Sequence, residues 1–139
     1  MKKVFIDTSI FIRFFTKDIE TKYQECEDFF RLIESGSIKP YTSNIVLMEI
    51  IFVLTRQYKF SGTKVGKALE KLLDIRNLTL IEKSDTPKAL RLFEKYKIKY
   101  ADCLISTQIP QKTILITYDS DFLKIKSLKT ATPKEIISN

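Results

Sequence analysis

The sequence predicts an α/β fold in which a central, mostly parallel sheet of four to five strands is covered by helices on both faces. Short apolar segments alternate along the chain with longer segments whose apolar residues recur at helical spacing. Fully apolar strands such as Thr113-Ile114-Leu115-Ile116 are typical of parallel sheets, which helical crossovers bury on both faces. The chain has three Gly, four Pro and no linker-like stretch, so residues 1–139 are expected to form one domain.

Five short segments are predicted to be strands, and the clearest of them are apolar. The first is Lys3-Val4-Phe5-Ile6, and the strongest buried-strand signal is the segment that ends at Ile116. Residues 129–132 are expected to form an edge strand. The predicted strands are 3–6, 38–42, 78–81, 113–116 and 129–132.

Helical spacing and end signals define the segments between these strands. Residues 20–35 place apolar side chains three or four positions apart and are followed by Gly36, a stop signal. Helix starts are marked by the capping or first-turn residues Ser43 or Asn44, Ser61 and Pro87. The predicted helices are 9–16, 20–35, 44–58, one capped by Ser61, 86–96, 101–108 and 119–125. In the helix capped by Ser61 the expected inner face consists of Val65, Leu69, Leu72 and Leu73.

The composition excludes several kinds of chemistry. The chain contains no histidine, which rules out Ser-His-Asp and Cys-His catalysis, HExxH zinc sites and histidine-based RNA cleavage. Cys26 and Cys103 lie far apart within apolar patterns, as expected of reduced core thiols in a cytoplasmic protein. No uncharged run is long enough to span a membrane. The net charge of +7 favours a polyanionic partner, although a lysine excess also serves solubility.

Two acidic residues follow predicted strands. Asp7 comes directly after Val4-Phe5-Ile6, and Asp119 comes after the strand that ends at Ile116. In open parallel sheets, ligands bind beyond the carboxyl ends of the strands, near a switch in strand order. Each acid also has a structural explanation, because both precede helical segments, where carboxylates cap the helix and complement its dipole.

Two further acids lie inside apolar helical patterns. Glu49 is the only charged residue between Ile45 and Leu54, and an unpaired carboxylate buried there would cost several kcal/mol. It therefore needs a cation, which is either a salt-bridge partner or a metal ion. Asp102, in Ala101-Asp102-Cys103-Leu104-Ile105, is a milder case that a helix start could also explain.

The order of these four acids resembles that of the PIN-domain nucleases, most closely their VapC-type toxin branch. The resemblance covers Lys3 to about Leu128. Ser9 stands where the family often has Asn, and residues 109–112 lack the glycine commonly found before the last strand. The segments that carry the resemblance are 4–9, 43–49 with Leu54 and Arg56, 101–105 and 116–122.

The resemblance implies a role for each polar residue of these segments. Asp7, Glu49, Asp102 and Asp119 would form the catalytic, metal-holding quartet. Carboxylate oxygens without histidine or thiolate select Mg²⁺ or Mn²⁺, as one or two ions that activate water for attack on a phosphate. Thr8, Ser9, Thr117 and Asp121 would be auxiliary. Apart from the resemblance, Arg13 and Arg56 lie shortly after the motif acids and could contact substrate phosphates, although ordinary solvated charges explain them better.

By the same resemblance, the chain would be a Mg²⁺- or Mn²⁺-dependent endoribonuclease that leaves a 5′-phosphate and a 3′-hydroxyl. The toxin branch further implies a homodimer and a cognate antitoxin whose tail blocks the cleft, with the Phe-rich early helices as a source of apolar interface. The alternatives are a non-toxin PIN nuclease in RNA processing, a non-catalytic PIN fold that binds RNA or a partner, and a receiver-like phosphoacceptor domain. The last expects paired acids after the first strand, where this chain has only Asp7.

Overall fold

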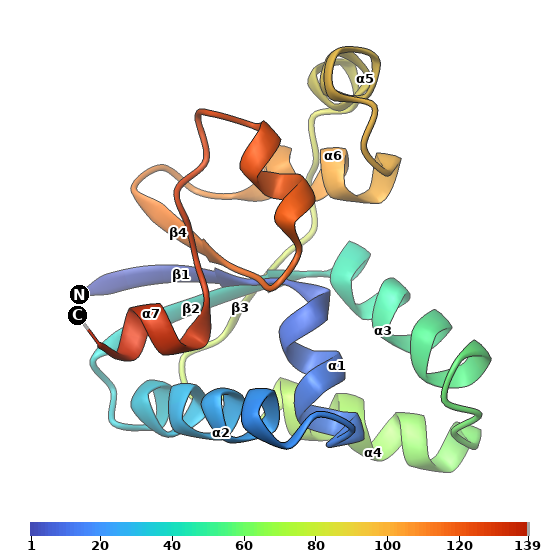
Figure 1. Ribbon diagram of the computed structural model, residues 1–139, viewed down its shortest axis with the longest axis vertical. Helices are drawn as coiled ribbons and strands as arrows, with labels where there is room; N and C mark the ends of the chain where they lie inside the picture. The colour runs from blue at the N-terminus through green and yellow to red at the C-terminus, as the bar shows by residue number, and fades with distance from the viewer. Residues whose placement is uncertain (139) are drawn as a thin grey trace.

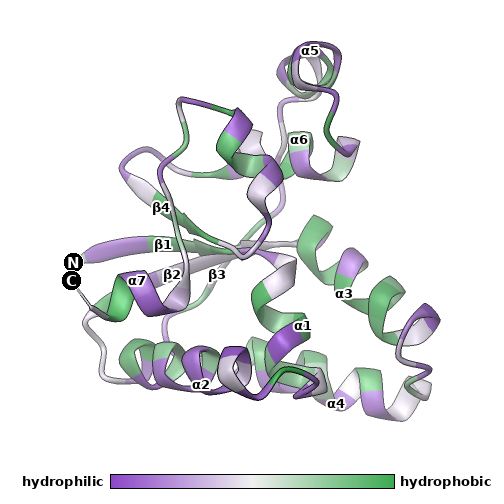
Figure 2. Cartoon of the chain, viewed as in Figure 1, coloured by the Kyte–Doolittle hydropathy of each residue, from purple (hydrophilic) through white to green (hydrophobic). Residues whose placement is uncertain are grey.

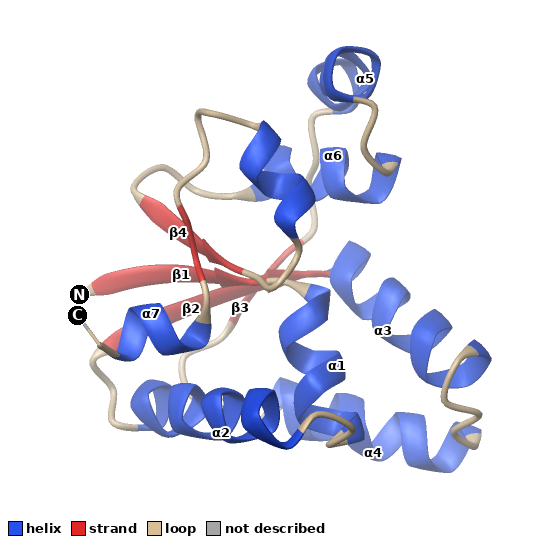
Figure 3. Cartoon of the chain, viewed as in Figure 1, coloured by secondary structure: helices blue, strands red, loops and turns tan. Residues whose placement is uncertain are grey.

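A computed structural model describes residues 1–138, and within them the sheet has five strands, all parallel. Figure 1 shows the sheet running through the middle of the molecule, and Figure 3 shows its strands between helices. The spatial order is β3-β2-β1-β4-β5. The strands are β1 (Lys2–Ile6), β2 (Ile38–Ser43), β3 (Thr79–Ile81), β4 (Thr113–Ile116) and β5 (Thr130–Ala131).

Helices lie on both faces of this sheet, which confirms the predicted three-layer α/β/α class. In the view of Figure 1, α1, α2 and α4 lie below the strands, whereas α5, α6 and η1 lie above them. Every predicted element is present with its ends within two residues of the prediction. The helices are α1 (Thr8–Thr16), α2 (Glu20–Glu34), α3 (Asn44–Arg56), α4 (Gly62–Leu73), α5 (Thr86–Tyr96), α6 (Tyr100–Gln108), the 3₁₀ helix η1 (Ser120–Lys124) and α7 (Pro133–Ile137).

Polar side chains start the helices as the sequence indicates. The side chain of Ser43 accepts a hydrogen bond from the backbone of Val46, so Ser43 rather than Asn44 is the N-cap of α3. Ser61 caps α4 in the same way. After α2 the chain turns at Gly36, whose φ of 87° is a left-handed conformation that costs glycine little.

The central strands provide the core. Val4, Phe5 and Ile6 of β1 and Leu115 and Ile116 of β4 are fully buried. Figure 2 shows this apolar colouring at the carboxyl half of β1 and along β4. Strand β1 lies in the middle of the sheet between β2 and β4, and helices cover both faces of the sheet. The side chains of β1 are therefore buried on either face.

The position of Leu73 differs from the sequence-based expectation. Leu73 was expected on the inner face of α4 but is 57% exposed. Val65, Leu69 and Leu72 already occupy the i, i+4 and i+7 positions of the buried stripe, and a rotation of about 100° per residue turns the next side chain toward solvent.

No helix in residues 1–138 is long and apolar enough to cross a membrane.

Helix α7 was not predicted, although its start has a clear sequence signature. Thr132 and Glu135 form a reciprocal capping box, and Pro133 occupies the first turn. The helix packs against α2, where Ile136 is buried in the main core. Its five residues are too few to show a helical apolar repeat, which is why periodicity alone did not reveal it.

We expect Leu115→Ala in β4 to lower the free energy of unfolding by about 2–5 kcal/mol, because it leaves a cavity beside the central strand. Leu123→Ala removes the same atoms from a side chain that is 62% exposed and should change stability by less than about 0.5 kcal/mol. Urea titrations of both variants test this difference. Equal losses would contradict the assignment of β4 to the core.

Candidate metal centre

Four acidic residues that are far apart in the sequence line one pocket of about 160 Å³. Asp7 follows β1, Asp119 lies just beyond β4, Glu49 comes from α3, and Asp102 from the first turn of α6. Strands β2 and β3 lie on one side of β1, whereas β4 and β5 lie on its other side. The pocket therefore lies at a switch in strand order, where parallel α/β sheets usually bind ligands. The lining residues are Asp7, Thr8, Ser9, Ile12, Arg13, Glu49, Val53, Lys99, Asp102 and Asp119.

Asp7 is held in place by hydroxyl groups. Its Oδ2 accepts hydrogen bonds from Thr117 Oγ1 at 2.7 Å and from Ser9 Oγ at 2.9 Å, and it also caps α1. The side chain is buried, which raises the pKa of its carboxyl group, as does the negative charge of Glu49, while the two hydroxyls oppose this rise. The capping role and the pocket position of Asp7 therefore coexist.

Glu49 is partly buried and already has a cationic neighbour. Its Oε1 accepts a hydrogen bond from Thr8 Oγ1 at 2.7 Å, and its Oε2 lies 3.3 Å from Lys99 Nζ. The sequence allowed either a salt-bridge partner or a metal ion for Glu49, and the structure shows a salt bridge to a lysine. Lys99 was missed at the sequence level, although it lies only three residues before Asp102.

Asp102 is the acid that most clearly lacks a partner. It is 2% exposed, and among residues 1–138 no group donates a hydrogen bond to its buried Oδ2 atom. Burial raises its pKa to about 7, opposed by Lys99 and reinforced by the charges of Asp7, Glu49 and Asp119. A buried, unsatisfied carboxylate oxygen is costly unless a cation or a proton compensates it.

Asp119 and Asp121 complete a second group of ligand atoms with Asp102. One carboxylate oxygen from each of these three residues lies within 4.8 Å of the others. Asp119 caps η1 by accepting a hydrogen bond from the backbone of Asp121, and its own backbone N–H donates to Thr117 Oγ1. Asp121 was expected to be auxiliary, but its carboxylate lies as near to Asp102 and Asp119 as a metal ligand would.

These donors fit a hard divalent cation. Every potential ligand is a carboxylate or hydroxyl oxygen, the kind that Mg²⁺ and Mn²⁺ prefer. The buried Oδ2 of Asp102, which accepts no hydrogen bond from residues 1–138, is an acceptor that such a cation would satisfy. Both cysteines are buried as free thiols, and neither lines the pocket.

The two predicted phosphate-binding arginines lie in different places. Arg13 lines the acidic pocket, but its guanidinium donates to both carboxylate oxygens of Asp18 and to the hydroxyl of Tyr58. Arg56 lies at the end of α3, with its guanidinium 5.7 Å from the ring centre of Phe52, outside the lining of the pocket.

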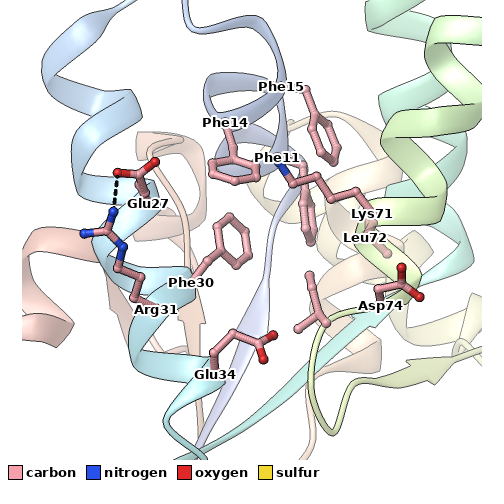
Figure 4. Close-up of a pocket in the computed structure, with 11 residues that line it drawn as sticks. Phe11, Phe14, Phe15, Glu27, Phe30, Arg31, Glu34, Lys71, Leu72 and Asp74 are labelled. Atoms are coloured by element: carbon pink, nitrogen blue, oxygen red, sulfur yellow. Dashed lines mark hydrogen bonds and ion pairs between the residues drawn. The ribbon is translucent and has the colours of Figure 1, made fainter.

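Two apolar surfaces lie apart from the acids. The first, the Phe groove, has a volume of about 300 Å³ and lies between α1, α2 and α4, lined by Phe11, Phe14, Phe15 and Phe30 with charged residues at its rim (Figure 4). The second, the α3 patch, consists of Met48, Ile51 and Phe52, which are 66%, 42% and 59% exposed. The Phe-rich early helices were expected to provide core or apolar interface, and the structure shows that some of their phenylalanines line a concave groove.

A model of the PIN domain matches residues 4–128, and the chain therefore belongs to the PIN domain family. This membership removes the receiver-like alternative. Among curated relatives, a VapC ribonuclease from Aquifex aeolicus (strain VF5) is 24% identical over 132 residues, which cover 94% of this chain and 96% of that protein.

Solved structures share the fold at low identity. VapBC2 from Rickettsia felis, bound to a DNA fragment from its promoter, contains a chain with a TM-score of 0.67 and 20% identity, over 94% of this chain and 98% of that one. A toxin–antitoxin complex from Klebsiella pneumoniae gives a TM-score of 0.62 and 22% identity, over 94% and 97% of the two chains.

We expect the stability of the metal-free protein to fall as the pH rises from about 4 to above 7, in part because of Asp102. Its folded-state pKa of about 7 lies above the unfolded value of about 3.9, so the folded state binds the extra proton in this window. That contribution is fully present below pH 4 and is lost as the pH passes 7.

Asp102→Asn removes this proton-binding group and should make the dependence of the urea midpoint on pH shallower than in the wild-type protein. Both proteins are measured in EDTA at pH 5 and pH 8. Parallel pH profiles for the two proteins would show that Asp102 does not titrate as described.

Proposed function

We propose that this chain is a Mg²⁺- or Mn²⁺-dependent endoribonuclease in which Asp7, Glu49, Asp102 and Asp119 hold the metal. The observation that carries this proposal is the meeting of four distant acids in one pocket, with a buried Asp102 oxygen that has no hydrogen-bond partner in the described residues 1–138. Asp121 joins them as a fifth carboxylate on the side of Asp102 and Asp119.

When bound, the divalent ion supplies an activated water and neutralises charge that develops on the phosphate. The chain supplies the geometry. Thr117 and Ser9 fix the carboxylate of Asp7, and Thr8 fixes that of Glu49, so that oxygens face the pocket before any ligand arrives. The short distances among Asp102, Asp119 and Asp121 keep these carboxylates close enough to share one cation.

RNA is the proposed substrate class. The VapC protein of Aquifex aeolicus is named a ribonuclease, and the present chain has a net charge of +7 despite its cluster of acids. Basic residues outside the pocket attract a phosphate backbone, which the acids alone would repel. Arg13 lines the pocket and could contact such a backbone if its guanidinium left Asp18.

We further infer that the chain acts in the cytoplasm as the toxin of a toxin–antitoxin pair. Support comes from the named VapC relative and from the complex of Klebsiella pneumoniae, both similar over more than nine tenths of this chain. The Phe groove suits an apolar segment of the antitoxin, because a concave apolar surface accepts an inserted partner helix or strand.

The expected homodimer has a different surface available. The α3 patch exposes Met48, Ile51 and Phe52 side by side on one helix, and Figure 2 shows α3 as apolar over most of its length. A patch on a single helix can pair with its own copy across a two-fold axis, as an isologous interface requires.

Purified protein should cleave labelled RNA with Mg²⁺ or Mn²⁺ and lose this activity in EDTA. Asp7→Asn and Asp102→Asn should each lower the rate at least about 100-fold, because each removes a charged ligand from the metal centre. Asp28→Asn, on the exposed face of α2, is the matched control and should leave the rate unchanged. The readout is the rate of RNA cleavage with 5′-end analysis of the products. Cleavage that persists in EDTA and in both variants would come from a contaminant and would overturn the proposal.

Phe52→Glu should convert the dimer into a monomer, since it places a charge in the middle of the α3 patch. Light scattering coupled to size-exclusion chromatography measures the mass directly. Leu73→Glu introduces the same charge at a side chain that is equally exposed but lies on α4, and it should remain dimeric. A wild-type monomer, or a Phe52→Glu dimer, would contradict this interface.

A further inference from the structure

Lys99 brings a positive charge into a pocket that is otherwise built for a cation. It precedes α6, lines the pocket with Asp7, Glu49, Asp102 and Asp119, and forms an ion pair of 3.3 Å with Glu49 Oε2. Its side chain is 67% exposed, so the ammonium reaches the acids from the mouth of the pocket on a flexible stem.

We propose that Lys99 is a tethered counter-ion of the metal centre, which neutralises the acids in the metal-free protein and opposes the entry of a divalent cation. This inference rests on the metal centre proposed above and adds a residue that regulates its affinity. It assigns to Lys99 a role in positioning and charge balance, distinct from that of a metal ligand.

The hydrogen bonds of Glu49 carry the first step. One oxygen accepts from Thr8 at 2.7 Å and the other faces Lys99 at 3.3 Å. Each carboxylate oxygen has a second lone pair, so Lys99 does not block Oε2, but its positive charge lies where a metal ion bound to that oxygen would meet it. Asp102 differs, because its Oδ2 atom has no partner among residues 1–138.

The positions of the remaining charges carry the second step. Asp102, Asp119 and Asp121 approach one another within 4.8 Å and form the side of the site where a divalent ion has free oxygens. Glu49 and Lys99 form the other side. Lys99 lines the same pocket as Asp102 and Asp119, so its ammonium lies in the field of those carboxylates as well as beside Glu49.

Arg13 does not provide the same charge, although it too lines the pocket. Its guanidinium lies 3.0 Å from Asp18 and donates to both oxygens of that carboxylate. Asp18 thus compensates the charge of Arg13 locally. The ammonium of Lys99, by contrast, forms its ion pair with one of the pocket acids.

The test is a Mn²⁺ titration of the full chain without RNA, followed by calorimetry or by the electron paramagnetic resonance of free Mn²⁺. Lys99→Gln should bind Mn²⁺ about three- to tenfold more tightly than the wild type, the range for a partly exposed charge beside a divalent ion. Lys99→Arg keeps the charge and should bind like the wild type. Lys67→Gln, an exposed lysine of α4 outside the pocket, changes the net charge equally and should also bind like the wild type.

A second readout is thermal stability. Metal-free Lys99→Gln should melt below the wild type because the acids lose their counter-ion, and the rise in Tm on adding Mn²⁺ should be larger than in the wild type. If Lys99→Gln binds Mn²⁺ no more tightly than Lys67→Gln, the proposed role of Lys99 is wrong while the metal centre stands. If the wild type binds no Mn²⁺ and Asp102→Asn changes nothing, the metal centre itself is wrong.

Discussion

The mutual repulsion of converging carboxylates is the constraint around which this molecule is organised. Asp7, Glu49, Asp102 and Asp119 come from four elements and meet in a pocket of about 160 Å³, where burial weakens the screening that water would provide. Hydroxyl donors offset part of the cost at Asp7 and Glu49, and the ammonium of Lys99 offsets more. At Asp102, burial first and the neighbouring carboxylates in addition raise the pKa to about 7. A bound divalent cation would relieve all four at once.

The sheet topology explains why these acids meet. Parallel strands direct their carboxyl ends to the same edge, and the order β3-β2-β1-β4-β5 makes β1 and β4 neighbours although 110 residues separate Asp7 from Thr117. The buried apolar residues of the two central strands are thus what holds two of the acids in register. Helices α3 and α6 then bring Glu49 and Asp102 over the same edge. The packing of the core therefore determines the geometry of the site.

Much of the fold could be predicted because its elements have strong local signals. The apolar run of β4, the capping serines and Gly36 all indicate boundaries that depend on nearby residues alone. The four pocket acids were also predictable, since strand-end and mid-helix carboxylates are conspicuous against apolar neighbours. Lys99 and the outward turn of Leu73 were not predictable in this way. They depend on side-chain directions and on charges brought together from distant segments, and a lysine in a lysine-rich stretch carries no local signal.

The short outer strands of the sheet restrict how other molecules can attach to it. β3 has three residues and β5 has two, so each rim offers very few backbone groups to a strand from another chain. Fibre-like stacking through the sheet rims is disfavoured for the same reason. Recognition must therefore rely on side-chain surfaces, whose specificity can diverge between related proteins without disturbing the backbone that supports them.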